Sequence, residues 1–387
     1  QYIFIEPGDS IMFRLNTVGF DESLAFSGRG AEKNNFLMNL FLQNEEEDKR
    51  LPELYKLNPK PFEKEIFHVK KALLRELDEF IISEKPSESF IHIALANINY
   101  NYYSRKELYL SSKKTASDHK DTQYPENFFT YRDSIELNDN TLKNYYTYYQ
   151  FINRYLDNLA YHGHTKKEPT FNKISYWHQT QKLKLIDSLI TNKQLHDNLL
   201  QNTVKRYLVH ADDPKKEHDL VALYKKLDHN KAHQNEVEKY AHNTAKINAG
   251  KLIPNLALIS TNSEITSIQK INTSKTVFFF CNSESVKHYK EIHVRVADLK
   301  NKYPEYTFIG INTGSDLEAW KKTVISSGYN PSQEYLLKNS STAKNALFIN
   351  SANKAMIVDK GGIILEGNSN LFNQNFESLL LGHLNKK

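Results

Sequence analysis

The sequence predicts a chain of mixed class, with an α/β region at residues 251–387. A mostly α-helical region, residues 36–247, precedes it, and a short β segment, residues 1–35, comes first. Three observations support this division. Helical spacing of apolar residues dominates the middle of the chain, and buried-strand runs alternate with amphipathic stretches after Gly250. The length of 387 residues also fits two to three domains.

The N-terminal segment has the pattern of a hairpin. Tyr2 and Phe4 alternate with polar neighbours, Pro7-Gly8-Asp9 can form a tight turn, and "SIMFRLNT" follows as a second strand. Two strands alone are marginally stable in water. We therefore expect this segment to be the end of an N-terminal β domain, completed by strands upstream of Gln1 or by another part of the chain.

Helical periodicity is strongest in "FEKEIFHVKKALLRELDEFII", residues 62–82. It places Phe67, Lys70, Leu74, Leu77 and Ile81 at helical spacing. Further helices are predicted at residues 89–110, 141–161, 177–190, 193–210 and 235–250. The abundant tyrosines of these helices are interpreted as packing residues whose rings are buried and whose hydroxyl groups are exposed to water, rather than as a sugar-binding or base-stacking surface.

The C-terminal region alternates strands and helices. The continuous apolar run "KTVFFFC" predicts a buried strand that ends at Cys281. A helix, a second strand and a helix capped by Ser315 come next. Two strands joined by Lys360-Gly361-Gly362 and a closing helix complete the region. The order is therefore parallel strands connected by helices, then an antiparallel hairpin and a last helix.

Composition excludes several classes of site. The net charge is only +5, from 51 basic and 46 acidic residues that are interleaved, so nucleic-acid binding is not expected. The single cysteine, Cys281, allows neither an intrachain disulfide nor a cysteine-based zinc site. No apolar run is long enough to span a bilayer. His229 and His233 have a zinc-compatible i,i+4 spacing, but a third ligand is missing, so a solvated helix face is favoured. No metal or cofactor is predicted.

Three stretches of the C-terminal region resemble a known family: "GKLIPNLALIS", "TVFFFCNSESVKHYKEI" and "AMIVDKGGIIL". They are similar to the thioredoxin-like domain of the TlpA/ResA group, envelope proteins of Gram-negative bacteria that usually reduce or isomerise disulfides. The upstream "PGDSIMFRLN", followed by a long helical insert, resembles regions attached to such domains. The resemblance implies a thioredoxin-like fold for residues 251–387.

The same resemblance implies a degenerate active site. The family pattern reads Trp-Ser-x-x-Cys-x-x-Cys, then Lys-Glu and a hydrophobic residue. Aligned by Lys290-Glu291-Ile292, it places Ser285 on the first cysteine, His288 on the second and Cys281 on the tryptophan. The cis-proline of the family falls at about Asn353. Since the redox chemistry needs a thiolate at a helix N-terminus and a resolving thiol, the resemblance implies no catalytic residue here.

Two alternatives concern the same residues. Ser285 and His288, at i,i+3, could form a nucleophilic pair, but that would require an orienting carboxylate and an oxyanion site. We favour Ser285 as the cap of the following helix. Cys281, at the end of an apolar strand, is interpreted as a buried, inert thiol rather than a reactive one.

The predicted function is that of a non-catalytic envelope protein. It would use the redox-inactive domain and the helical region to bind other envelope proteins, as an accessory subunit of a larger periplasmic or outer-membrane assembly. The resemblance implies the periplasmic side of a Gram-negative envelope, with an outer-membrane lipoprotein as the outcome if a lipid anchor precedes Gln1. A peptide- or glycan-binding module and a thiol-disulfide oxidoreductase acting through Cys281 are the alternatives.

Overall fold

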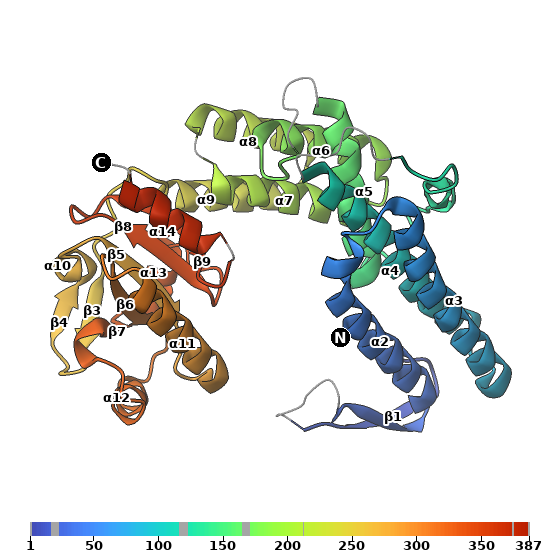
Figure 1. Ribbon diagram of the computed structural model, residues 1–387, viewed down its shortest axis with the longest axis horizontal. Coiled ribbons are helices and arrows are strands. Elements are labelled where there is room, and N and C mark those ends of the chain that lie inside the picture. Colours follow the sequence, from blue (N-terminus) through green and yellow to red (C-terminus); the bar gives the residue numbers. More distant parts are fainter. Residues whose placement is uncertain are drawn as a thin grey trace. The chain divides into compact units, whose positions relative to one another are not determined.

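The chain forms two compact units, Gln1–Thr203 and Val204–Lys387. The computed structural model describes residues 2–16, 23–115, 123–164, 171–211, 213–373 and 375–385. Unit 1 is mostly helical, and unit 2 contains a seven-stranded sheet with helices (Figure 1). The expected helical and α/β regions are therefore present. The three-part division at residues 35 and 251 stays a prediction.

The N-terminal segment of unit 1 forms a small hairpin. Strands β1 (Ser10–Arg14) and β2 (Ala25–Arg29) pair antiparallel. The predicted turn is confirmed, because the Asp9 N–H donates to the Glu6 carbonyl over 3.0 Å and Gly8 has a φ of +96°. The strand expected at Tyr2 and Phe4 is wrong. The Asn34 side chain bonds the N–H and the carbonyl of Phe4, each over 2.8 Å, and so replaces a neighbouring strand.

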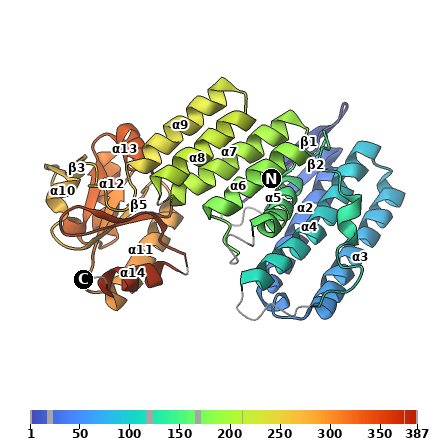
Figure 2. The ribbon, with the colours of Figure 1, turned by 90° about the horizontal axis from the view of Figure 1, so that it is seen from above.

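Helices build the rest of unit 1, and α2, α3 and α4 are long neighbours (Figure 2). Helix α4 packs against α2, α3 and α5, and α5 packs against α6. Among the described residues, no helix combines the length and the apolarity needed to cross a membrane. The helices are α2 (Ala31–Leu54), α3 (Pro59–Glu84), α4 (Glu88–Thr115), the 3-10 helix η2 (Thr130–Ser134), α5 (Tyr146–His164), α6 (Tyr176–Leu189) and the first part of α7 (Lys193–His210).

The buried side of α3 differs from the predicted stripe. Phe62, Ile66, Leu73 and Leu77 are buried, whereas 53% of the Phe67 surface is exposed. The buried residues face apolar and tyrosine side chains of α2 and α4. The apolar periodicity predicts that the segment is a helix, but it does not show which of two adjacent stripes of residues packs against the neighbouring helices.

Tyr109 of unit 1 has the predicted packing role, but its hydroxyl is bonded within the protein rather than exposed to water. The Tyr109 ring is buried and stacks on Phe62 with ring centroids 4.0 Å apart. Its hydroxyl donates to the Leu57 carbonyl over 2.7 Å. The ring thus contributes apolar area while its polar end is satisfied.

Unit 2 contains a mixed sheet with the strand order β4-β3-β7-β6-β5-β8-β9. Strands β5, β6 and β7 are parallel to one another, β8 is antiparallel to β5, and β9 is antiparallel to β8. The predicted order is confirmed, with an additional parallel strand, β7, that sequence reasoning missed. The strands are β3 (Ala257–Ser260), β4 (Ile265–Ser267), β5 (Thr276–Cys281), β6 (Thr307–Asn312), β7 (Glu334–Leu337), β8 (Lys354–Val358) and β9 (Ile364–Asn370).

Helices cover both faces of this sheet. Every residue of β5 is buried, and its side chains alternate between the faces. Phe279 and Cys281 pack toward α11 and α14, whereas Phe278 and Phe280 pack toward α10 and α13. All the helices that begin within unit 2 are α8 (Pro214–Leu227), α9 (Lys231–Ala245), α10 (Ile268–Ile271), α11 (Val286–Lys302), α12 (Leu317–Ser326), η3 (Pro331–Gln333), α13 (Ser340–Ala346) and α14 (Phe376–Asn385), as far as the structure describes the unit.

The cap of α12 is Asp316, not the predicted Ser315. The Asp316 Oδ1 accepts a hydrogen bond from the Ala319 N–H over 2.9 Å. Serine and aspartate are both strong capping residues, so two adjacent candidates leave the start of a helix uncertain by one residue.

The outer edge of β9 is covered by the segment that follows α9. The Gly250 N–H donates to the Ile364 carbonyl, and the Ile364 N–H donates to the Lys251 carbonyl, each over 2.8 Å. At Gly367 the two segments are so close that a Cβ atom would lie 1.7 Å from the Ile247 carbonyl oxygen. Only glycine permits this approach.

Candidate functional site

The candidate site lies where β5 leads into α11. A tight loop connects them, in which the Ser285 N–H donates to the Asn282 carbonyl over 3.1 Å. The Asn282 side chain also accepts the Glu284 N–H over 3.0 Å. The loop after β6 is tied to the same place, because the Thr313 N–H donates to the Cys281 carbonyl over 2.8 Å. The carboxyl ends of two parallel strands thus form a common platform.

The structure brings His288 and Asn353 together. His288 Nε2 donates to Asn353 Oδ1 over 2.6 Å, which links the first turn of α11 to the loop before β8. Both side chains are half-buried. Sequence alignment alone placed these two residues at one site, and that juxtaposition is present.

Ser285 lies apart from this pair. Its side chain is exposed, and within the described ranges it forms no hydrogen bond with His288. Ser285 is the residue before α11, as expected, but its hydroxyl makes no capping bond. Its ψ of 75° departs from the extended conformation of a capping residue. The hydrogen-bond partner of His288 is a neutral amide, so the arrangement does not activate a serine nucleophile.

Cys281 is a buried thiol. Only 3% of its surface is exposed, and it packs among Tyr289, Ala355 and other apolar residues beneath α11. Burial raises the pKa of the Cys281 thiol well above its usual range, and the nearby Glu334 carboxylate raises it further. Because the thiolate is the reactive form, both effects suppress reactivity.

A pocket of about 380 Å³ opens beside these residues. Its polar lining is mostly neutral, and His288 and Lys344 are its titratable side chains apart from the thiol. Cys281 also contributes to the lining, although it is nearly inaccessible. The lining residues are Phe280, Cys281, Asn282, Ser285, His288, Thr313, Lys344, Ile349, Asn350, Ser351 and Ala352.

One wall of the pocket depends on an unusual residue conformation. Phe348 has a φ of +50°, and the Ile349 N–H donates back to the Lys344 carbonyl over 2.8 Å. This left-handed residue ends α13 and turns the chain along the pocket. Tyr240 of α9 holds the Phe348 ring edge-on, with centroids 4.8 Å apart.

A smaller hollow of about 210 Å³ adjoins the pocket. It shares Lys344, Ile349 and Asn350 with it, and α9 supplies its other side. Sequence reasoning missed this contribution of α9, and it missed Lys344, Asn350 and Thr313. These residues have no diagnostic spacing. The only available signal was topological, because ligands of α/β sheets gather at the carboxyl ends of parallel strands.

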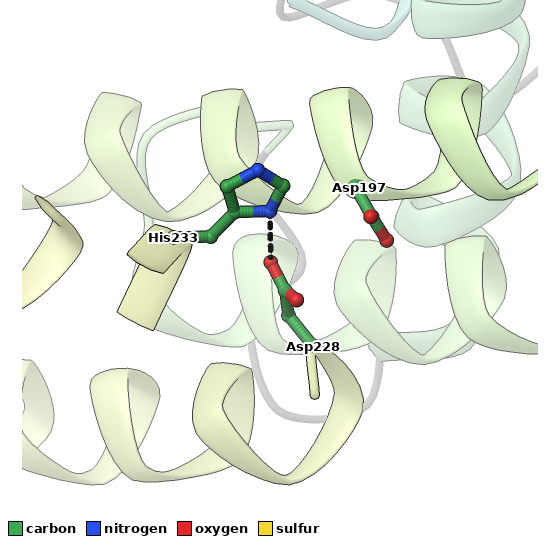
Figure 3. Close-up of side chains that lie close together, drawn as sticks. All are labelled: Asp197, Asp228 and His233. Atoms are coloured by element: carbon green, nitrogen blue, oxygen red, sulfur yellow. Dashed lines mark hydrogen bonds and ion pairs between the residues drawn. The ribbon is translucent and has the colours of Figure 1, made fainter. Parts of the chain in front are cut away.

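The histidines considered for zinc are not placed as a helical pair. His229 is exposed and precedes α9, which begins at Lys231. His233 instead bonds Asp228 over 3.1 Å through Nδ1 (Figure 3). The Asp228 carboxylate also accepts the Tyr224 hydroxyl over 2.7 Å and the Asn230 N–H over 2.8 Å. These bonds fix the turn between α8 and α9.

No protein-family model matches the chain, and no curated protein matches it. Several solved structures are similar to part of it. The thioredoxin domain of a thiol-disulfide oxidoreductase from Bacteroides vulgatus is 17% identical, with 35% of this chain and 98% of that chain covered and a TM-score of 0.28. A thioredoxin-like protein from Bacteroides caccae is 12% identical, with 59% and 92% covered and a TM-score of 0.34. A thiol:disulfide interchange protein from a Bacteroides species is 18% identical, with 31% and 81% covered and a TM-score of 0.27.

The topology itself gives the fold. Parallel strands β5 and β6 are joined by α11, and the antiparallel pair β8 and β9 is followed by α14. Unit 2 contains a domain with the strand and helix order of the thioredoxin-like fold. The degenerate assignment of Ser285, His288 and Asn353 within it stays a prediction.

Proposed function

We propose that unit 2 is a redox-inactive thioredoxin-like module that binds an extended segment of another envelope protein in the pocket beside α11. The observation that supports this proposal is the placement of polar groups at the start of α11. In the alignment that the resemblance implies, Ser285 and His288 fall on the positions of the two thiols. The single thiol, Cys281, is buried, and its pKa is raised.

The chemistry of the pocket suits a polypeptide. Asn282 and Asn350 carry amides that can both donate and accept hydrogen bonds, as a peptide backbone does. His288 and Lys344 add limited charge. Loops positioned by a rigid sheet are a common location for such recognition. A protein with this module would act as an accessory subunit of an assembly on the periplasmic side of a Gram-negative envelope, attached to the outer membrane if a lipid anchor precedes Gln1.

The proposal is tested by purifying the tagged protein from its native envelope in mild detergent and identifying bound proteins by mass. Asn350→Trp fills the pocket from an exposed position, and Lys360→Trp places the same side chain in the exposed turn between β8 and β9. We expect stoichiometric companions with the wild-type protein and Lys360→Trp, and their loss with Asn350→Trp.

Two results would contradict the proposal. Companions that survive in Asn350→Trp would place the interaction elsewhere, and a protein that purifies alone would remove the accessory role. The same preparation tests the oxidoreductase alternative by maleimide labelling of Cys281. We expect labelling only after denaturation, because the thiol is buried; rapid labelling of the native protein would restore that alternative.

A further inference from the structure

Unit 1 contains a second polar pocket, which the proposed function does not use. It has a volume of about 500 Å³ and lies between α3, α4 and the segment around η2. Cationic and aromatic side chains dominate its lining. The lining residues are Glu63, Lys64, Phe67, Lys70, Tyr102, Tyr103, Lys106, Asn127, Thr130, Tyr131 and Ser134.

Lys106 is a fixed cation in this pocket. Only 2% of its surface is exposed, and its Nζ atom lies 2.6 Å from Glu63 Oε1. The same ammonium lies 4.2 Å from the centre of the Phe128 ring and 4.8 Å from that of Tyr131. One carboxylate and several ring faces therefore compensate its charge.

Lys70 is less well compensated. Its Nζ atom lies 4.7 Å from the Tyr102 ring centre and 5.1 Å from the Tyr103 ring centre. Within the part of the chain that the structure describes, it has no carboxylate partner and no hydrogen-bond acceptor. Burial, and then the neighbouring Lys106 charge, lower the pKa of Lys70. A partly desolvated ammonium without an acceptor is unfavourable, and a bound anion would relieve that cost.

The lining indicates what kind of anion fits. Lys106 is already paired with Glu63, and Lys64 is exposed to solvent. Lys70 is therefore the partly buried ammonium that a single negative charge, such as a carboxylate, would compensate. No arginine, the usual bidentate partner of phosphate, is among the lining residues.

The other lining residues suit a ligand that carries hydroxyl groups. The Thr130 hydroxyl donates to the Asn127 carbonyl over 2.9 Å, and the Ser134 hydroxyl donates to the Tyr131 carbonyl over 3.0 Å. Since their protons are used, both oxygen atoms are left to accept hydrogen bonds. The half-exposed Phe67 ring offers an apolar face at the same pocket.

We propose that this pocket binds an acidic sugar, with the ligand carboxylate on Lys70 and its hydroxyl groups on the Thr130 and Ser134 oxygens. The site is independent of the pocket in unit 2, so either can fail without the other.

The test is calorimetric titration of the full chain with glucuronate, with glucose and inorganic phosphate as comparison probes. The decisive variant is Lys70→Met. Its matched control is Lys71→Met, which removes the same charge from the next, exposed position of α3. We expect glucuronate to bind better than glucose and phosphate. Lys70→Met should weaken glucuronate binding by about tenfold to a hundredfold, the usual effect of losing a charged hydrogen bond, and Lys71→Met should leave it unchanged.

Proton linkage supplies a second readout. A bound carboxylate raises the pKa of Lys70, so binding should take up protons as the pH rises toward that pKa, seen as a heat that depends on the buffer ionisation enthalpy. The wild-type protein should show this uptake and Lys70→Met should not. The proposal is overturned if glucuronate gives no heat, if glucose or phosphate binds as well, or if both lysine variants bind like the wild type or lose affinity equally. Far-UV circular dichroism checks that the variants are folded.

Discussion

The interiors of the two units are built differently. In unit 1, the buried Glu107 carboxylate accepts hydrogen bonds from Arg132 and Asn158, and the buried Asp157 pairs with Lys182 over 2.6 Å. In unit 2, the two faces of the sheet are filled by large apolar clusters. A helix such as α4, rich in Asn, Tyr and Lys, has too few apolar residues to fill its surroundings, so paired charges complete its packing.

The largest expected effect concerns Glu107. Its carboxylate accepts bonds from the Tyr131 hydroxyl over 2.5 Å, from Arg132 over 2.8 and 2.9 Å, and from Asn158 over 2.6 Å. Glu107→Ala leaves all these donors without their acceptor and should lower the free energy of unfolding of unit 1 by about 3–5 kcal/mol. Urea unfolding followed by circular dichroism at 222 nm measures it.

The control for that substitution is Glu46→Ala. Glu46 and Lys49 form an exposed pair at 2.7 Å, for which a change within about 1 kcal/mol is expected. If Glu107→Ala and Glu46→Ala lower the free energy of unfolding equally, the buried network around Glu107 stabilises unit 1 no more than an exposed ion pair does.

The next effect concerns Lys354, a buried ionisable residue of the sheet in unit 2. It is 1% exposed, donates to the Gly367 carbonyl and to Asn368, and burial lowers its pKa to about 7. In the unfolded chain a lysine titrates near pH 10.4. Between these pH values the unfolded chain holds one more proton, so the free energy of unfolding should rise with pH, by at most about 1.4 kcal/mol per pH unit.

The measurement compares the wild-type chain with Lys354→Met between pH 7 and pH 10. Trp320 is fully buried in unit 2, and its fluorescence in a Trp177→Phe background reports on that unit. The slope of stability against pH should be smaller in Lys354→Met. Identical slopes in the two proteins would show that Lys354 is charged in the folded state.

The smallest effect concerns Ile311, which is buried in the apolar cluster of unit 2. Ile311→Val removes one methylene group and should cost about 0.5–1.5 kcal/mol. Glu107→Gln keeps the shape of its side chain but loses its charge, and we expect it to cost more. Urea titration of both variants measures the two losses of unfolding free energy. A larger loss for Ile311→Val than for Glu107→Gln would contradict the proposed difference between the two interiors.

This difference also explains what could be predicted from the sequence. The apolar runs of β5, β6 and β8 predicted the positions of these strands closely, because strands covered on both faces need continuous apolar residues. Strand β7 was missed because "EYLL" is short and begins with the buried Glu334. In unit 1 the helices were predictable, but the partners of Glu107 lie 24 to 51 positions away in the sequence, and no local pattern reveals them.

The candidate site was predictable only in part. Alignment to a family pattern placed His288 and Asn353 at one site, and they are hydrogen-bonded. The walls of the pocket could not be foreseen. They depend on the left-handed Phe348, and β-branched or aromatic residues rarely adopt that conformation. The Lys70 pocket was not predicted either. In the sequence, Lys70 is one position of a helical stripe, and nothing local shows which residues of α4 and η2 lie beside it.

The segment that covers β9 has a consequence for how the chain can be divided. Ile247 and Gly250 lie before residue 251, yet they shield the outer edge of the last strand. A fragment that starts at Lys251 would keep every strand of unit 2 and the bond between the Ile364 N–H and the Lys251 carbonyl, but it would uncover the part of the β9 edge beside Ile247 and Gly250. Such edges recruit strands from neighbouring chains, so that fragment would tend to self-associate, whereas one that starts at Val204 carries its own protection.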